Sequence, residues 1–533
     1  MVRQAHSVYD YVIVGAGSAG CVLAARLSED PAVRVLLLEA GGKDWHPFIH
    51  MPAGLAKLVR NRRINWDYYT EPEPALEQRR LWWPRGKVLG GSSSINAMCY
   101  VRGHPRDYDE WAALGCRGWS FAEVLPYFRK AERNARGADT FHGCEGPLSV
   151  EDLRYVNPLS QLAIEAAVAA GYPRNDDFNG ATQEGFGLYQ VTQREGRRAS
   201  AARAYLGMAR GRRNLEVLTR AFAERIEFAS GRAVAVRYRH RGKTHRAEAA
   251  REILIAAGAI NSPQLLMLSG IGPPDALRRL GIEVVSESPE VGANLQDHLD
   301  ACILRRCTQR ITYDRVNDLA LALEYLFTRR GIGTSNIAEA GGFVRSALAR
   351  DERPDLQFHF VPAMLDDHGR NRLPGDGFTM HVCVLRPESR GRIELRSADP
   401  GVPPLIRPHY LSDPEGRDLR VLVEGVRIAR RILAQPSLKP FAGAEIFPGA
   451  EANDDASLIA FVRRKAETIY HPVGTCRMGS DAGAVTDPEL RVRGVEGLRV
   501  VDASIMPRIV GGNTNAPVIM IAERAADLIR NRS

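Results

Sequence analysis

Lysine is scarce in this chain, and its scarcity limits what the positive charge implies. The 533 residues carry a net charge of +9, yet only seven of the 72 basic residues are lysine. The arginines are scattered among acidic residues and form no long basic block, so the charge does not indicate a nucleic-acid-binding surface. A weak attraction to anionic membrane surfaces stays open.

Three other features are missing. None of the eight cysteines forms a C-x-x-C pair or a zinc-type spacing, so no metal site is predicted, and we expect reduced thiols in a cytoplasmic protein. No apolar run approaches the roughly 20 residues of a membrane helix, so any contact with the inner face of a membrane is expected to be peripheral. The first strand begins by about Tyr9, and we expect no signal peptide before it.

The composition is otherwise ordinary for a globular protein. Hydrophobic residues make up 44% of the chain and charged residues 25%. This length and composition suffice for a large core, and length alone suggests roughly two to four domains.

The opening stretch predicts a dinucleotide-binding unit. An apolar strand runs into Gly15-Ala16-Gly17-Ser18-Ala19-Gly20 and then into an Ala/Leu-rich helix. In such a turn the first glycine permits the sharp bend, the second lets the backbone approach a pyrophosphate, and the third lets the helix pack on the strand. A second strand ends in Glu39, at the spacing expected of a carboxylate that binds an adenosine ribose. This unit alone does not distinguish FAD from NAD, although Glu39 disfavours an NADP-type ligand.

The rest of the chain shows two kinds of predicted secondary-structure order. Strands are predicted at Leu215–Thr219, near Ala233–His240 and at Arg251–Ala256, and the last runs into a helix that starts at Ser262-Pro263. Within residues 194–209, the stretch Ser200–Leu206 is predicted to be helical. Between residues 305 and 465 strands and helices follow one another without βαβ alternation, which indicates an α+β unit on an antiparallel sheet.

Four segments, in order along the chain, carry a family resemblance. They are Gly86–Tyr100, which contains Gly90-Gly91-Ser92-Ser93-Ser94, then Gly258–Gly272, Val500–Pro507 and Gly511–Pro517. Together they resemble the signatures of the glucose–methanol–choline (GMC) family of FAD-dependent oxidoreductases, nearest to its bacterial alcohol and choline dehydrogenase-like members. The resemblance implies an α/β fold, with a Rossmann-like FAD-binding domain (1–157, 215–304 and 470–533) and an inserted α+β substrate domain (158–214 and 305–469).

The resemblance also assigns the catalytic residues. Alcohol oxidation by FAD moves a hydride to flavin N5, and a general base that removes the hydroxyl proton contributes about 10²–10⁴-fold. His471 lies in Ile469-Tyr470-His471-Pro472-Val473, which resembles the family's active-site histidine segment, and Pro472 restricts its backbone to extended conformations. Asn515 is matched to the family's second active-site position, occupied there by His or Asn, where its amide would hydrogen-bond the substrate oxygen.

The cofactor residues follow from the same comparison. The resemblance assigns the ADP half of FAD to the first glycine turn and Glu39, the flavin and pyrophosphate to Gly86–Tyr100, the ribityl–phosphate region to Val500–Pro507, and the adenine to the backbone of Ala223. The residues are Gly15, Ala16, Gly17, Ser18, Gly20, Glu39, Ala40, Val88, Gly91, Asn96, Ala97, Met98, Cys99, Ala223, Asp502 and Ala503. Some relatives attach FAD to a histidine where this chain has Ile95, so non-covalent FAD is expected.

Three other residues receive weaker interpretations. His298, in Asn294-Leu295-Gln296-Asp297-His298, fits a family pattern and is interpreted as structural. Glu339 is equally compatible with the substrate pocket and with a structural role. Arg386 suits an anionic substrate group, although an ion pair at a strand end is favoured.

The predicted function is FAD-dependent oxidation of an alcohol to an aldehyde or ketone, with a dehydrogenase favoured over an oxidase and a primary alcohol favoured as substrate. Choline is the alternative substrate, although the sequence shows no aromatic cage for a quaternary ammonium. An FAD-containing lyase of the same fold and an NAD-dependent dehydrogenase are the alternatives outside this reaction. The electron acceptor, whether oxygen, a quinone or a carrier protein, stays open, as does the oligomeric state.

Overall fold

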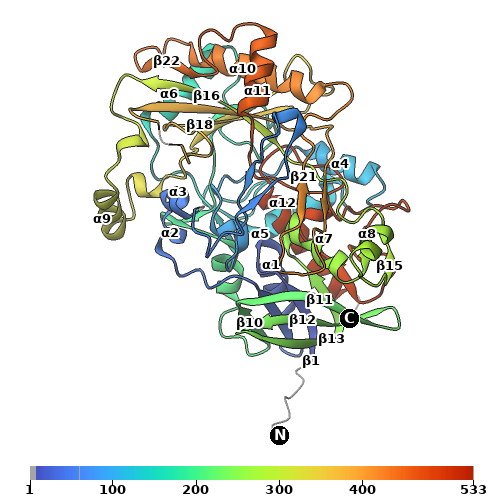
Figure 1. The fold of residues 1–533 in the computed structure, drawn as a ribbon. Helices are drawn as coiled ribbons and strands as arrows, with labels where there is room; N and C mark the ends of the chain where they lie inside the picture. Colours follow the sequence, from blue (N-terminus) through green and yellow to red (C-terminus); the bar gives the residue numbers. More distant parts are fainter. Residues whose placement is uncertain (1–7, 59, 372, 532–533) are drawn as a thin grey trace.

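The structure is a computed structural model that describes residues 8–58, 60–371 and 373–531. Two large sheets lie toward opposite ends of the molecule, with β1, β10, β11, β12 and β13 at the bottom of Figure 1 and β16, β18 and β22 near the top. The helices are α1 (Ser18–Leu27), α2 (Pro47–His50), α3 (Leu55–Leu58), α4 (Pro105–Ala113), α5 (Phe121–Ala131), α6 (Pro158–Ala169), α7 (Gly258–Leu268), α8 (Pro274–Arg279), α9 (Asp318–Thr328), α10 (Arg417–Leu433), α11 (Asp455–Lys465) and α12 (Asn515–Arg530).

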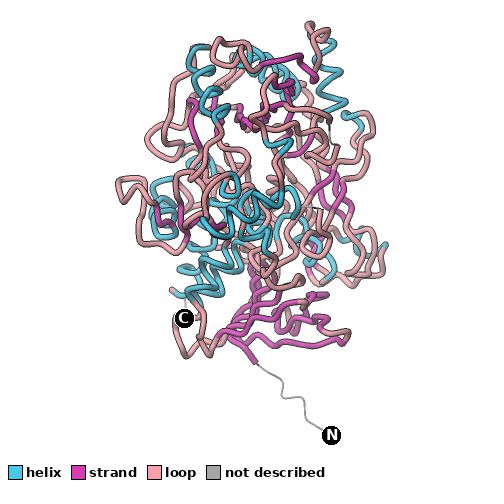
Figure 2. Tube along the Cα trace, turned by 90° about the vertical axis from the view of Figure 1, so that its left-hand side faces the viewer, coloured by secondary structure: helices cyan, strands magenta, loops and turns pink. Residues whose placement is uncertain are grey.

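The first sheet contains the predicted dinucleotide-binding strands. Its order is β10-β2-β1-β13-β12-β11, and β24 also pairs with β13. These strands are β1 (Val8–Val14), β2 (Val35–Glu39), β10 (Leu215–Thr219), β11 (Ala221–Ala229), β12 (Arg232–His240), β13 (Lys243–Ile255) and β24 (Leu498–Val500). The pairs of β1 with β2, β2 with β10, and β13 with β1 and β24 are parallel, as expected of a Rossmann-like unit. Figure 2 shows these strands gathered at the lower end of the molecule.

An antiparallel meander extends this sheet beyond the prediction. β13 begins eight residues before the predicted Arg251, and it pairs with β12, which pairs with β11. Arg and Glu side chains alternate with apolar ones along these strands, which is typical of a sheet with one solvated face. The sequence analysis predicted β12 and the end of β13, but the polar residues hid β11 and the first part of β13.

The second sheet is antiparallel, as predicted. Its order is β22-β16-β19-β18-β17-β7, with β23 beside β16. The strands are β7 (Gly185–Leu188), β16 (Leu299–Cys307), β17 (Ala340–Val344), β18 (Leu356–Val361), β19 (Gly377–Val384), β22 (Ala442–Phe447) and β23 (Glu467–Thr468). β16 begins before the predicted domain boundary at residue 304, so the boundary falls inside a strand. α10 packs on β16 and β19 and covers this sheet from outside.

The remaining strands form short pairs. They are β3 (Tyr68–Tyr69) with β4 (Trp82–Trp83), β5 (Glu132–Asn134) with β6 (Leu148–Val150), β8 (Gln193–Arg194) with β9 (Arg197–Arg198), β14 (Ile271–Gly272) with β15 (Ser286–Glu287), and β20 (Arg392–Glu394) with β21 (Leu405–Arg407). The β8–β9 hairpin, which the sequence did not reveal, precedes the helical stretch predicted at Ser200–Leu206. That stretch is confirmed as a π-helical turn at Ala202–Leu206.

α7 begins four residues earlier than predicted. It starts at Gly258, which has a φ of +81°, so Ser262 is inside the helix and does not cap it. Pro263 cannot donate to the carbonyl of Ala259 four residues earlier. The hydroxyl of Thr475 donates to that carbonyl instead, at 2.7 Å. A contact distant in sequence therefore lets the helix begin before its proline.

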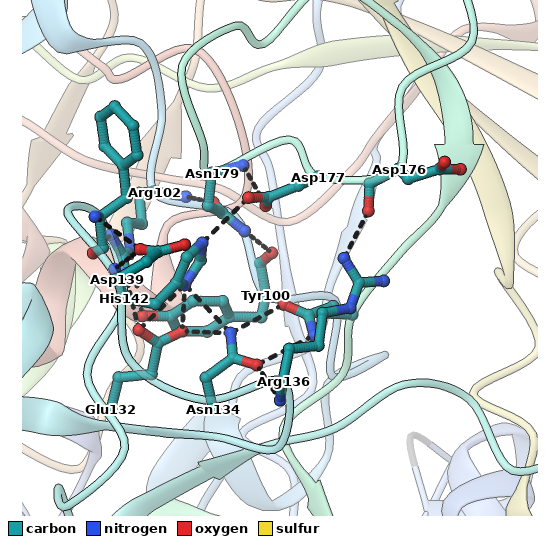
Figure 3. Close-up of polar contacts among 12 residues, drawn as sticks. Tyr100, Arg102, Glu132, Asn134, Arg136, Asp139, His142, Asp176, Asp177 and Asn179 are labelled. Atoms are coloured by element: carbon teal, nitrogen blue, oxygen red, sulfur yellow. Dashed lines mark hydrogen bonds and ion pairs between the residues drawn. The ribbon is translucent and has the colours of Figure 1, made fainter.

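A buried polar cluster, drawn in Figure 3, fixes the segment that follows residues 86–99. Arg102 pairs with Glu132 at 2.5 Å, and Glu132 also contacts His142 Nδ1 at 3.1 Å. The other ring nitrogen of His142 lies 3.0 Å from Asp177. Burial alone would lower the pKa of His142, but the hydrogen bonds to Asp177 and Glu132 outweigh it and raise the pKa to about 9. The charged imidazolium thus joins β5 to the loop that carries Asp177.

Candidate active site

One cavity connects the two sheets. Its volume is about 430 Å³, and its wall is more apolar than polar. At one end it is lined by the β1–α1 turn and the end of β2, and at the other by side chains from β18, β19 and the segment 468–472. Elongated ligands bind in such clefts between domains, at the carboxyl ends of parallel strands.

The first end of the cavity has the features of a phosphate and ribose site. α1 begins directly after Gly17, and no side chain caps its first turn. Its unpaired N–H groups and dipole therefore face the cavity. Glu39 accepts hydrogen bonds from the backbone N–H of Ala16 at 2.9 Å and of Gly41 at 2.7 Å. Burial raises the pKa of this carboxyl to about 7.

The glycines of this end leave space for a ligand. A Cβ on Gly17 would meet only the carbonyl of Ala256, at 3.9 Å, and a Cβ on Gly258 would have nothing within 4 Å. Both residues line the cavity, so side chains there would fill it. Gly91 packs against Gly17 so closely that a Cβ would come within 2.7 Å of its Cα. The residues present therefore fit a dinucleotide whose pyrophosphate touches backbone.

Most of the predicted cofactor residues line this cavity. They are Gly15, Gly17, Ser18, Glu39, Ala40, Gly91, Asn96, Ala97, Met98, Cys99, Ala223, Asp502 and Ala503. Ala16 and Gly20 lie behind the wall: Ala16 donates to Glu39, and a Cβ on Gly20 would fall 1.8 Å from the Gly15 carbonyl oxygen. Val88 is fully buried and bridges Gly42 instead, because the strand-like pairing of residue 88 turns its side chain into a core formed with Ile49 and Ile95.

The cavity wall also contains residues that the sequence analysis missed. Trp66 and Phe222 contribute aromatic surface beside Ala223. Arg85 lies in the wall with its guanidinium donating to the Tyr470 carbonyl at 2.7 Å, and burial lowers its pKa to about 10. Arg85 precedes the first signature directly, so its position in the sequence was the available signal.

His471 is held in the cavity wall by its backbone. Its N–H donates to Asp297 Oδ1 at 2.7 Å. The other oxygen of Asp297 accepts from Thr468 Oγ1 at 2.6 Å and from the Tyr410 hydroxyl. The preceding residue, Tyr470, has a φ of +71°, a conformation uncommon outside glycine. These constraints place the imidazole reproducibly.

The ring of His471 makes two hydrogen bonds that define its protonation. Its Nδ1 lies 3.0 Å from His298 Nδ1, and its Nε2 lies 3.2 Å from Asn513 Nδ2. Gln357 Nε2 donates to Asn513 Oδ1 at 3.0 Å, which leaves the Asn513 amino group to face His471. An amino group only donates, so Nε2 of His471 carries the lone pair and Nδ1 carries the proton.

This arrangement bears on two sequence interpretations. Asn515 was predicted as the partner of His471, but its Oδ1 accepts from Ser18 Oγ at 2.7 Å and joins the first turns of α12 and α1. Asn513, in the loop before α12, reaches His471 instead, while Asn515 lines the cavity from the first turn of α12. His298, interpreted as structural, contacts His471 directly. Both contacts span long separations that periodicity cannot show.

Electrostatics keep His471 neutral. Burial lowers its pKa well below the ordinary 6.5, and the neighbouring His298 and Arg85 lower it further. Burial also lowers the pKa of His298, to about 3. A neutral imidazole with a free Nε2 lone pair accepts a proton, so His471 has the state of a general base.

Polar side chains line the cavity beyond His471. His359, His368, His381, Tyr470 and Asp300 belong to this wall. His381 Nδ1 lies 2.7 Å from Asp300 Oδ2, and this carboxylate raises the pKa of His381 against the effect of burial. This end of the cavity can therefore hydrogen-bond polar groups of a small molecule.

Glu339 and Arg386 lie outside this wall. Glu339 is fully buried and accepts from the N–H of Asn157 at 2.8 Å and from Ser160 Oγ at 2.7 Å. Arg386 pairs with Asp107, as favoured for a strand-end ion pair. Asp107 also accepts from the N–H of Gly511 at 2.7 Å, so this pair supports the loop that carries Asn513.

Comparison with known proteins places the chain in a family. Two family models described as GMC oxidoreductase match residues 9–300 and 387–522. The chain is 50% identical to an alcohol dehydrogenase [acceptor] of Pseudomonas putida, over 98% of this chain and 96% of that protein. It is 49% identical to the mitochondrial choline dehydrogenase of Homo sapiens, over 99% and 91%. A structure of an Aspergillus oryzae RIB40 formate oxidase variant, studied for FAD modification, is 27% identical and superposes with a TM-score of 0.93, covering 99% of this chain and 98% of that one.

Proposed function

The chain belongs to the GMC oxidoreductase family, and from this premise we propose that it uses FAD to oxidise an alcohol to an aldehyde or ketone, with His471 as the general base. The observation that carries the proposal is the neutral, anchored imidazole of His471 at the junction between the dinucleotide end of the cavity and its polar end. The relatives named alcohol and choline dehydrogenase support a CH–OH donor.

The protein's own residues supply the proton transfer. The Nε2 lone pair of His471 accepts the hydroxyl proton, while its Nδ1–H stays bonded to His298. Asn513 now donates to that lone pair, at 3.2 Å. When an alcohol takes this place, the same amide hydrogen is available to the alcohol oxygen and stabilises the negative charge that develops on it.

FAD, when bound, supplies the hydride acceptor at N5. The turn at Gly15–Ser18 and the α1 N-terminus would hold the pyrophosphate, and Glu39 the adenosine ribose. Asp502 is fixed by Ser262 Oγ at 2.5 Å and the N–H of Gly258 at 2.8 Å, and would bind on the ribityl side. Trp66, Phe222 and the backbone of Ala223 would flank the adenine.

We propose that FAD is bound without a covalent link. Ile95, at the position of the linking histidine in some relatives, offers no nucleophile, and burial raises the pKa of the nearby Cys99 thiol to about 12, so it stays protonated and unreactive. Precipitation with trichloroacetic acid should release all yellow colour into the supernatant, and a coloured pellet would contradict this.

A primary alcohol is the proposed substrate and choline the second candidate. The carboxylate of Asp300 in the cavity wall and the choline dehydrogenase relatives favour choline. Against it, Tyr470 is the one aromatic residue other than histidine among the described residues that line the polar end, whereas quaternary ammonium groups are held by several aromatic faces. Asp300 is also already paired with His381. This end of the cavity therefore suits a neutral hydroxyl better than a cation.

One experiment tests the reaction and separates these substrates. The FAD-loaded protein is mixed anaerobically with 1-alkanols, aromatic alcohols and choline in turn, and the flavin absorbance is followed. Bleaching by a neutral alcohol supports the proposal, and bleaching by choline alone moves it to choline oxidation. A flavin that none of them bleaches would contradict alcohol oxidation and favour a lyase. Slow recolouring in air supports the proposed dehydrogenase, and rapid recolouring an oxidase.

A further inference from the structure

One helix presents an apolar face to solvent. On α9 (Asp318–Thr328), Leu319 is 70% exposed, Leu323 47%, Leu326 59% and Phe327 81%. Their spacing places all four on one side of the helix. Burying a leucine or phenylalanine side chain contributes about 1.5–3 kcal/mol. A cluster of four exposed apolar side chains therefore indicates a surface that binds a protein or a membrane.

α9 is unusual within this protein. Other large apolar side chains that are exposed, such as Leu114, Val168 and Val285, occur singly on different elements. Tyr325 is the one buried residue of α9, and its hydroxyl donates to the His50 carbonyl at 2.9 Å. In Figure 1 the helix lies at the left edge of the molecule, beside α2 and α3. Its outer face therefore has no cover within the described chain.

Several arginines gather near the C-terminal end of α9, where Glu195 and Glu324 are the carboxylates close by. Arg197 and Arg203 lie close enough to Tyr325 to lower its pKa against the effect of burial. Each has a buried guanidinium nitrogen without a hydrogen-bond partner among the described residues. After burial, the main influences lowering the pKa of Arg203 are the positive charges of Arg197 and Arg194. The arginines therefore crowd one another.

The helix dipole does not account for this number of arginines near the end of α9. Cations near a helix C-terminus gain typically 0.3–1 kcal/mol from its dipole, and the effect is confined to the last turn. Arg329 already caps this end and lies over the Tyr325 ring at 4.5 Å. At the opposite end of the helix, Lys57 of α3 bonds Asp318 at 2.6 Å. Basic residues thus flank the apolar face at both ends.

We propose that α9 lies in the interface of an anionic lipid membrane, with Leu319, Leu323, Leu326 and Phe327 among the acyl chains and the flanking basic residues at the headgroups. An amphipathic helix with apolar residues on one side and basic residues at its margins has this property. No helix of the described chain is long and apolar enough to cross a membrane, so attachment is at the surface.

A second copy of the chain fits the same face less well. A two-fold interface places the same patch of both copies together. The arginines of one copy would then face those of the other, and like charges across an interface disfavour it. A layer of anionic headgroups compensates them instead.

The position of α9 relates this surface to the cavity. Leu55, the first residue of α3, and Ile337, just after α9, both line the cavity. A membrane beneath α9 would therefore lie beside the segments that form the cavity wall. Lipophilic alcohols or electron acceptors dissolved in the membrane would be concentrated there.

Vesicle sedimentation with the FAD-loaded full chain tests the proposal. Vesicles of phosphatidylglycerol and phosphatidylcholine are compared with pure phosphatidylcholine, at low and high salt. Binding to the anionic vesicles should be stronger and weakened by salt. The double variant with Leu326→Glu and Phe327→Glu should bind at least about 100-fold more weakly, since two large apolar groups are removed from the interface. The matched control, with Leu114→Glu and Val168→Glu on other elements, should bind as the unchanged chain does.

Flavin absorbance and turnover with a water-soluble dye confirm that each variant is folded, since Leu326 and Phe327 are not among the described residues that line the cavity. Absence of vesicle binding by the unchanged chain would overturn the proposal, and so would equal binding by the α9 variant. A stable dimer in light scattering that the α9 substitutions dissociate would assign the face to a second copy instead. These outcomes do not depend on which alcohol is oxidised.

Discussion

Replacing Asn513 by alanine, beside the parallel change at Asn515, tests the site most directly. Asn513 Nδ2 lies 3.2 Å from His471 Nε2, where the alcohol oxygen is expected, and Asn515 is bonded to Ser18 at 2.7 Å instead. Both changes remove the same amide, two positions apart. The structure therefore predicts a large effect on the rate of flavin reduction at one position and a small one at the other.

The magnitude follows from what remains in each variant. In Asn513→Ala, His471 keeps its bond to His298 and its backbone bond to Asp297, so the base stays in place. The loss is that of one donor to the developing oxyanion, which costs about 10²–10³-fold, and we expect the lower value. In Asn515→Ala one ordinary hydrogen bond is lost, worth about 0.5–1.5 kcal/mol of stability, and the rate should change less than about tenfold.

The assay is anaerobic stopped-flow bleaching of the flavin at saturating alcohol, which measures the reductive step alone. Asn513→His should recover part of the rate, because an imidazole N–H can also donate to the alcohol oxygen. FAD content is measured for each variant, so that cofactor loss is not mistaken for slow chemistry. A larger rate loss in Asn515→Ala than in Asn513→Ala, with FAD bound in both, would refute the assignment.

Three further predictions concern charge. His471→Ala should retain FAD and slow flavin reduction by about 10²–10⁴-fold; rapid bleaching would contradict its role as base. Because the pKa of His471 is lowered below 6.5, the base is neutral at pH 7. The rate of flavin reduction should therefore stay constant on acidification to pH 6.5 and fall only below it. A rate that already falls between pH 8 and 7 would contradict this. The pKa of His142 is raised to about 9, so its stabilising contribution is complete below about pH 6.5 and is lost as the pH rises through 9. The melting temperature of the chain should fall over this pH range more than that of His142→Gln. Equal falls in melting temperature would exclude the effect.

Local sequence patterns were sufficient to predict several elements. Leu215–Thr219 and Leu356–Val361 are strands with the predicted bounds, because apolar β-formers between turn residues are sufficient to specify them. In the antiparallel meander, β12 and the end of β13 were predicted, whereas β11, the first part of β13 and the β8–β9 hairpin were missed. Their charged residues face solvent, and their pairing partners decide their structure more than their own periodicity does.

The sequence alone determined the glycine turn, Glu39 and the position of His471, because these depend on backbone conformation and on motifs of a few neighbouring residues. Tertiary structure decided which side chains meet. His298 and His471 are separated by 173 residues, and Asn513 and His471 by 42. Their contact depends on where α12 begins, on the loop held by Asp107 and on the register of the second sheet. These features bring distant segments together by tertiary packing, which no local sequence pattern encodes.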